Sequence, residues 1–152
     1  MKLNIHNVPD LTKRPPRSPR VRLGGYVILA RVIDKGRATL AGKNGEYRYN
    51  SQIDERLFKF LQIKPEDLLE QLKLGKGDGE ILQWIKDHLP KKHSIWEVVQ
   101  WSSFTEQFSP GTIKFREHLN GEVAKWNPER TDIVTAFDLL DLDDHASFGG
   151  KA

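Results

Sequence analysis

The sequence predicts a mainly α-helical fold, an irregular bundle of six to seven helices with an extended basic N-terminal arm. Apolar residues recur at spacings of three and four in most segments, the period of a helix with one buried face. Helix-capping residues precede these segments, and Gly or Pro follows them. One short hairpin around Asn44-Gly45 is an open alternative to this otherwise helical pattern.

We expect residues 1–22 to form the arm and residues 23–152 to form a single helical domain. The arm carries three prolines between Lys13 and Arg22, which exclude a helix there and favour extended backbone. Its basic side chains suit phosphate groups, or they pack along the acidic C-terminal segment. No aromatic residue interrupts the basic run, so it offers no stacking platform for single-stranded nucleic acid.

The stretch from Leu23 to Leu40 predicts a buried helix. From Tyr26 to Ile33 only Arg31 is polar, so the alternation of a half-buried strand is absent. Its β-branched residues suit a buried strand, but the stretch is too long for an ordinary strand and has the length of a helix.

Charged residues on this helix form the main candidate site. Arg31, Asp34 and Arg37 are three residues apart, so they lie on neighbouring turns with Asp34 between two guanidiniums. Opposite charge keeps such a carboxylate ionised. Lys35 and one arginine then remain to bind an anion. The alternative is a purely structural ion-pair network at a helix end.

The segment Gly42-Lys43-Asn44-Gly45 predicts a turn. Residues 46–49 then alternate in polarity, which fits a small hairpin with 39–41 or, as we prefer, an extended loop. In either case Tyr47 and Tyr49 share one face, and their hydroxyls are expected beside the Asp34–Arg37 cluster. Plain packing of the two rings is the alternative.

Start and stop signals divide the rest of the chain into short helices. The starts are capping boxes, a first-turn proline and capping Asp or Thr side chains, and the stops are Gly and Pro. These signals lie at Ser51–Asp54, Pro65–Gly75, Asp78–Pro90, Ser94–Glu97, and Thr131 or Asp132, with an amphipathic stripe over Phe115–Trp126. Three tryptophans at helical spacing are expected to anchor the core, namely Trp84, Trp101 and Trp126.

The acidic C-terminal segment is a weaker candidate, for a metal. Asp138, Asp141 and His145 are three and four residues apart on one helical face, and such ligands suit magnesium, manganese or iron. No Glu-x-x-His pair supports such a site, and carboxylates near a helix C-terminus require a compensating charge. We therefore favour an ion-pair seam with the basic arm or with a partner, and we assign no metal ligand.

Composition bounds the class of protein. The 152 residues are 38% hydrophobic and 30% charged, as in one soluble globular domain. No apolar run reaches the length of a membrane span, and no secretory signal is recognised, so we expect a cytoplasmic protein without a membrane partner. The absence of cysteine excludes disulfides and thiol catalysis. Residues 13–37 carry eight basic side chains and one acidic one, whereas residues 132–144 carry five acidic and no basic ones.

Several phrases of the sequence resemble the bacterial domain-of-unknown-function family DUF5069. The phrases are Ile33-Asp34-Lys35-Gly36-Arg37-Ala38, Gly45-Glu46-Tyr47, Phe137–Asp144 and Ser147–Ala152. The resemblance implies a compact, helical bacterial domain and transfers no catalytic residue. This chain has Gly36 where the family more often has Ala.

The sequence favours a domain that binds a ligand carrying phosphate or carboxylate. The residues assigned to this anion site are Arg17, Arg20, Asp34, Lys35, Arg37 and Tyr47. One alternative is an enzyme acting on a small anionic substrate, with Asp34 or the Asp141–His145 group as acid, base or metal ligand. Another is a nucleic-acid-binding protein. No motif identifies a cofactor, a substrate or an oligomeric state.

Overall fold

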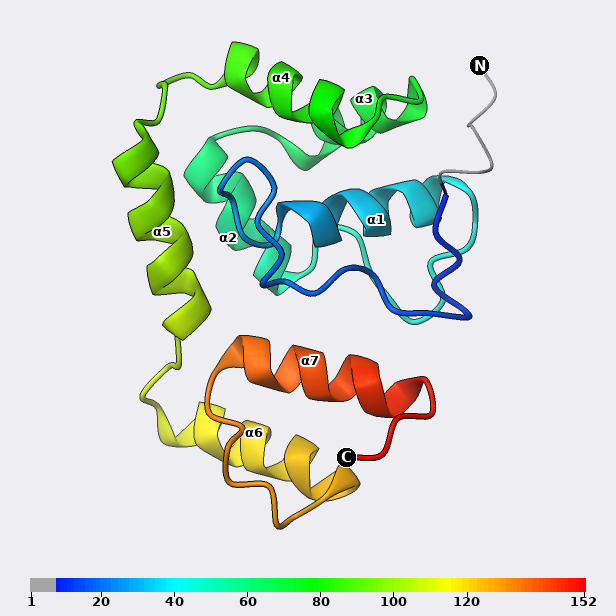
Figure 1. Ribbon diagram of the computed structural model, residues 1–152, viewed down its shortest axis with the longest axis vertical. Coiled ribbons are helices and arrows are strands. Elements are labelled where there is room, and N and C mark those ends of the chain that lie inside the picture. The colour runs from blue at the N-terminus through cyan, green and yellow to red at the C-terminus, as the bar shows by residue number, and fades with distance from the viewer. Residues whose placement is uncertain (1–7) are drawn as a thin grey trace.

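The computed structural model describes residues 8–152, which form seven α-helices and no β-strand (Figure 1). The helices are α1 (Leu29–Leu40), α2 (Gln52–Leu61), α3 (Pro65–Lys73), α4 (Asp78–His88), α5 (Ile95–Gln107), α6 (Ile113–Trp126) and α7 (Ala136–Ser147). The predicted mainly α-helical bundle is therefore confirmed. Residues 41–50 form successive turns, so the loop is present and the alternative hairpin is not.

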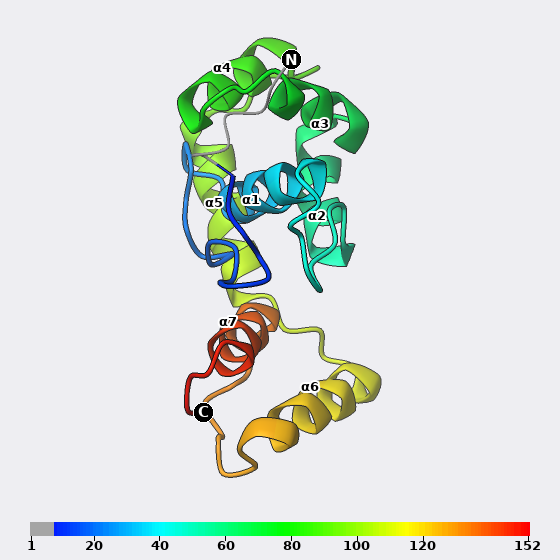
Figure 2. The same ribbon diagram turned by 90° about the vertical axis from the view of Figure 1, so that its right-hand side faces the viewer.

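The helices form a larger and a smaller end, connected along one side by α5 (Figures 1 and 2). In the larger end, α1 lies in the middle, with α2, α3 and α4 around it. The smaller end consists of α6 and α7, and α7 faces the larger end. The described part of the arm, residues 8–22 in blue, passes between α1 and α7.

Helix α1 begins at Leu29, six residues after the predicted start at Leu23. Gly24 and Gly25 adopt positive φ of 58° and 87°, a conformation that glycine tolerates best. They close a tight turn in which the backbones of Leu23 and Tyr26 exchange two hydrogen bonds, of 3.1 and 3.0 Å. The apolar stretch is buried as predicted, but only its second part is helical.

Gly36 allows α1 to pack closely on its neighbours. The helix continues without interruption through this residue. A Cβ atom at Gly36 would lie 2.5 Å from Cδ1 of Leu72 on α3 and 3.2 Å from the ring of Tyr49. The glycine therefore marks a close approach between helices rather than a helix end.

The buried apolar side chains form two clusters. The larger one surrounds α1 and includes Phe137 at the start of α7. The smaller one lies between α6 and α7 and consists of Leu119, Val123, Ile133 and Leu142. Helix α7 thus contributes to both clusters, which holds the two ends of the molecule together.

Two details at the smaller end differ from prediction. The cap of α7 is Thr135, not Thr131 or Asp132, because the Thr135 hydroxyl accepts a hydrogen bond from the Asp138 N–H at 3.1 Å. Trp126 is 40% exposed and is not a core anchor, since α6 is covered only on the side facing α7. Trp84 and Trp101 do pack against the larger cluster.

Candidate functional site

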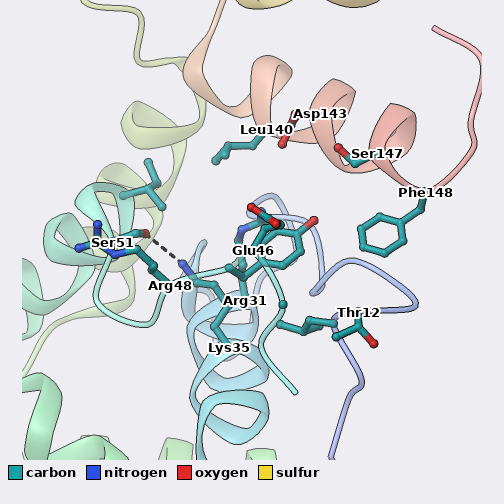
Figure 3. A pocket seen from close by; sticks show the side chains of 14 residues that line it. Thr12, Arg31, Lys35, Glu46, Arg48, Ser51, Leu140, Asp143, Ser147 and Phe148 are labelled. Atoms are coloured by element: carbon teal, nitrogen blue, oxygen red, sulfur yellow. Dashed lines mark hydrogen bonds between the residues drawn. The ribbon is translucent and has the colours of Figure 1, made fainter. Parts of the chain in front are cut away.

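A pocket of about 620 Å³ lies between α1, the turns that precede α2, and α7 (Figure 3). Cations from α1 and from the loop between α1 and α2 line one part of the pocket. Helix α7 supplies a carboxylate, a hydroxyl and an apolar side chain. The lining residues are Leu11, Thr12, Arg31, Lys35, Gly45, Glu46, Tyr47, Arg48, Ser51, Ile53, Leu140, Asp143, Ser147 and Phe148.

Lys35 is a buried ammonium held by two residues. Its Nζ atom donates to Oγ of Ser51 at 3.0 Å and to Oδ1 of Asp54 at 2.8 Å, and it lies 2.7 Å from Oδ2 of Asp54. Burial lowers the pKa of Lys35, and the charge and hydrogen bond of Asp54 oppose that effect.

Arg31, one turn earlier on α1, is held by a carboxylate of α7. Its two terminal nitrogens bind the two oxygens of Asp144 at 2.7 and 3.2 Å, and Nη1 also donates to the Arg17 carbonyl at 3.2 Å. The Tyr47 hydroxyl donates to Oδ1 of Asp144 at 2.7 Å, and the Tyr47 ring lies 5.5 Å from the guanidinium carbon. Burial, followed by the bond to Asp144, raises the pKa of Tyr47, so its hydroxyl stays protonated at neutral pH.

Asp143 is the carboxylate of α7 that lines the pocket. Burial raises its pKa, and the charges of Asp144 and Glu122 add to the shift, while Arg31 and the Ser147 hydroxyl oppose it. No Lys, Arg or His of residues 8–152 lies within ion-pair distance of its oxygens. The pocket is therefore lined by a carboxylate without an ion-pair partner among residues 8–152 as well as by cationic side chains.

The C-terminal segment completes the pocket wall. The Phe148 ring stacks on Tyr47, with centroids 6.5 Å apart and planes inclined by 9°. The chain then turns at Gly149, with φ of 87°, and the Gly150 N–H donates to the His145 carbonyl at 2.9 Å. The segment around Phe148 is thus packed on its own chain.

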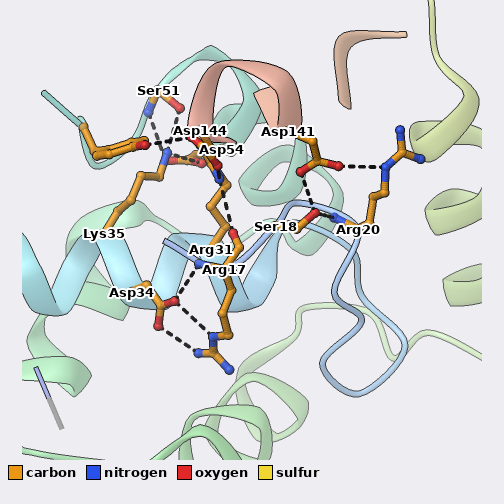
Figure 4. Close-up of polar contacts among 11 residues, drawn as sticks. Arg17, Ser18, Arg20, Arg31, Asp34, Lys35, Ser51, Asp54, Asp141 and Asp144 are labelled. Carbon is orange, nitrogen blue, oxygen red and sulfur yellow. Dashed lines mark hydrogen bonds and ion pairs between the residues drawn. The ribbon is translucent and has the colours of Figure 1, made fainter. Parts of the chain in front are cut away.

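Of the six residues assigned to the anion site, Lys35 and Tyr47 line this pocket. Arg17, Asp34 and Arg37 do not line it and belong to a second network, of which Figure 4 shows Arg17 and Asp34. Arg17 binds Asp34 at 3.0 Å and Asp78 at 2.7 Å, and Arg37 binds Asp78 at 3.0 Å. The prediction that Asp34 lies between Arg31 and Arg37 is therefore wrong: Asp34 pairs with Arg17 of the arm, whereas Arg37 reaches the network through Asp78 at the start of α4. Arg31 pairs with Asp144 instead.

Arg20, the sixth residue, joins the arm to α7 (Figure 4). Its guanidinium binds Asp138 and, at 3.0 Å, Asp141, and Ser18 donates to Asp141 at 2.8 Å. The predicted ion-pair seam between the arm and the acidic segment is therefore present. Residues 8–152 contain no group of three or more metal-ligating side chains, and Nε2 of His145 lies 3.1 Å from the Lys151 carbonyl instead.

The other functional side chains of the pocket escaped the sequence-based assignment. Arg48, Ser51, Asp143 and Ser147 come from two segments nearly a hundred residues apart, and they share no spacing or motif. The only local signal was the single aromatic Phe148 in the glycine-containing C-terminal segment. No local side-chain pattern predicts a pocket whose walls come from α1, the turns before α2 and α7 and are brought together only by the tertiary fold.

No helix within residues 8–152 is both long enough and apolar enough to span a membrane.

Comparison with known proteins indicates the family of the chain. None of the curated proteins matches the chain. The model of the family described as "Domain of unknown function (DUF5069)" matches residues 13–146, a range that contains all seven helices except the last residue of α7. The chain therefore belongs to the DUF5069 family.

Proposed function

We propose that the protein binds a small organic anion in the pocket between α1 and α7. The observation that supports this proposal best is a pair of cations in the pocket wall, the buried ammonium of Lys35 and the exposed guanidinium of Arg48, of which Arg48 has no carboxylate of residues 8–152 within ion-pair distance. A carboxylate or phosphate oxygen accepts strongly from such donors, because a charge-assisted hydrogen bond is stronger than a neutral one.

Arg48 is the second side chain that we expect to contact the bound anion. Arg31 and Lys35 each face a buried carboxylate, so they contribute donors but little net positive charge. Arg48 lines the same pocket, is exposed, and has no carboxylate of residues 8–152 within ion-pair distance. Its guanidinium is thus available to pair with a ligand anion.

The rest of the lining favours an organic ligand over an inorganic ion. Leu11, Ile53, Leu140 and the rings of Tyr47 and Phe148 provide apolar surface around the charged groups. Pockets of this size and mixed character are typical of small-molecule sites. Nucleic-acid binding is less favoured, because Arg17 and Arg20 of the arm are already paired with carboxylates.

A thermal-shift series tests the site, with inorganic phosphate, phenyl phosphate and 3-phenylpropionate as probes. A ligand at ten times its Kd adds about 1.4 kcal/mol, which raises Tm by roughly 3–6 °C in a protein of this size. We expect an organic acid to give such a shift in the wild-type protein. Arg48→Ala should remove most of it and leave the ligand-free Tm almost unchanged, because Arg48 is exposed.

Two further variants locate the binding site. Arg116→Ala removes an equally exposed arginine of α6 and should leave the ligand-induced shift intact. Arg37→Ala acts on the Asp78 network and should lower the ligand-free Tm without abolishing the shift. Loss of the shift in Arg37→Ala together with its retention in Arg48→Ala would contradict the pocket and favour the arm network.

An enzyme is the second candidate, because a carboxylate, a phenol and a guanidinium line the same pocket. Asp143, Tyr47 and Arg31 are all lining residues, and burial raises the pKa of Asp143, the direction that suits a carboxylic acid that donates a proton. Mass spectrometry of each stabilising compound after incubation with the protein tests this candidate. Turnover that Asp143→Asn abolishes would support it, and unchanged compounds would contradict it.

A further inference from the structure

The α7 wall of the pocket contains a carboxylate that the fold leaves without a cation. Helix α7 carries Asp138, Asp141, Asp143 and Asp144. Three of them are paired with arginines of the N-terminal part of the chain. Asp143, the member that lines the pocket, is paired with none within residues 8–152.

An unpaired, partly buried carboxylate has a cost that a bound cation would remove. Burial and two neighbouring acids disfavour the ionised form of Asp143. Proteins usually compensate such a group with a charged or hydrogen-bonding partner, as the other three aspartates of α7 illustrate. A donor on a ligand is the partner that the pocket leaves room for.

The positions of the charged groups indicate how a ligand would lie. In Figure 3, Asp143 and Ser147 project from α7, and Lys35, Arg48 and Ser51 lie across the pocket on α1 and the loop before α2. Leu140 of α7 and the ring of Tyr47 add apolar surface to the same lining, and Glu46 adds a second carboxylate. The cavity therefore has cations on the side of α1, the carboxylate of Asp143 on the side of α7, and apolar surface available to both.

We propose that the ligand of this pocket is dipolar, with an acid group bound by Lys35 and Arg48, an ammonium group bound by Asp143, and an apolar body against Tyr47 and Phe148. Small zwitterions of the amino-acid type have this chemistry. This proposal rests on the proposed function, because it keeps the acid group bound to Lys35 and Arg48 and adds an ammonium group at the other end of the same ligand.

Three compounds with one aromatic skeleton test the proposal in the full-length protein. 3-Phenylpropionate has the acid alone, phenethylamine has the amine alone, and phenylalanine has both. Leucine, 4-methylpentanoate and isopentylamine form the same set on an aliphatic skeleton. Binding is measured by calorimetry at neutral pH and low salt, and ligand-induced changes in Tm are measured alongside.

We expect the zwitterion of at least one skeleton to bind about tenfold more tightly than the corresponding acid, the effect of one charge-assisted hydrogen bond. In Asp143→Asn the advantage should fall below about twofold, because the neutral amide of similar size does not pair with an ammonium. Affinity for the plain acid should not change. Glu117→Gln, which alters an exposed acid of α6, should leave all affinities as in the wild type.

The outcomes separate the two proposals. If acid and zwitterion bind equally, or if Asp143→Asn keeps the zwitterion's advantage, the dipolar ligand is excluded and the anion site stands. If neither acids nor zwitterions of either skeleton bind, both proposals are excluded. A normal ligand-free unfolding transition of Asp143→Asn shows that the variant is folded, so loss of binding then reports on the site.

Discussion

Lys35 and Asp54 show how single residues give this fold its polar interior. Their side chains are only 4% and 0% exposed, and Nζ of Lys35 lies 2.7 Å from Oδ2 of Asp54, so each buried charge has an opposite charge beside it. Asp54 also accepts from the Ser51 N–H at 3.1 Å, so the same carboxylate caps α2 and holds the lysine of α1. Removing one member would leave the other charge buried and alone, which typically costs 3–5 kcal/mol, roughly the effect of losing a large core side chain.

Asp143, unlike Asp54, has no cationic partner among residues 8–152. Its carboxyl group leads to a prediction about how stability depends on pH. Its folded-state pKa lies above the ordinary value of 3.8, so the folded protein holds this proton more tightly than the unfolded chain does. Stability is therefore lost as pH rises from the ordinary pKa through the raised one. Asp143→Asn should raise the free energy of unfolding at pH 7 and have little effect near pH 3.

Urea unfolding of both proteins at the two pH values checks this prediction. Asp132→Asn is the contrasting variant, because its hydrogen bond with Arg130 lowers the pKa of Asp132 to about 2. It should not stabilise the protein at pH 7. Equal stability of wild type and Asp143→Asn at pH 7 would show that the carboxylate of Asp143 is not destabilised. A stabilising change at a binding site is expected where function and stability compete.

Among the helices, α7 is the element on which the site depends. Its N-terminus is fixed by a capping box in which Thr135 and Asp138 each accept from the other's backbone N–H. Asp138 also binds Arg20 of the arm. The start of the helix and the seam to the arm therefore share one carboxylate, and the cap helps to set the position of Asp143 two turns later.

Thr135→Ala should consequently destabilise the protein by about 1 kcal/mol, the usual cost of losing a capping hydroxyl. Thr131→Ala is the matched control, because Thr131 is exposed and lies before the helix, although the sequence predicted it or Asp132 as the cap in place of Thr135. It should change the free energy of unfolding by less than about 0.5 kcal/mol. Denaturant unfolding of the two variants decides between the two caps, and equal effects would contradict the assignment.

At the scale of the whole molecule, two apolar clusters differ greatly in size. The cluster around α1 draws on six helices, α1 to α5 and α7, and on the residues before α1, whereas the cluster between α6 and α7 contains four buried side chains. The smaller end is attached to the larger one through α5, Phe137 and the ion pairs of α7. Fewer buried contacts should make its local opening the easier one.

Leu119→Ala should therefore affect the two ends unequally. Removal of a buried leucine typically costs 2–5 kcal/mol, and this loss should appear mainly as faster amide hydrogen exchange in α6. Exchange in α1 should change much less. Leu57→Ala, at the fully buried position of α2, should instead accelerate exchange throughout the protein. Equal acceleration in α1 and α6 of Leu119→Ala would mean that the two ends unfold as one unit.

Much of the helical pattern was predictable, because its signals are local. The capping boxes at Ser51 and Ser94 and the helix that starts at Pro65 depend on residues within four positions of each other. The seam between Arg20 and α7 was predictable for a different reason, since two oppositely charged segments of one chain attract each other. The start of α1 was not, because the Gly24-Gly25 turn interrupts an apolar pattern that has helical length.

The sequence by itself determined the class of fold, the caps of α2 and α5, and the buried, charge-bearing character of α1. Only the tertiary structure decided which charges meet. Arg31 of α1 pairs with Asp144 of α7, 113 residues away, and Lys35 pairs with Asp54 of α2. Helix spacing specifies neighbours within one turn, whereas these partners come from other helices that only the folded chain places next to α1.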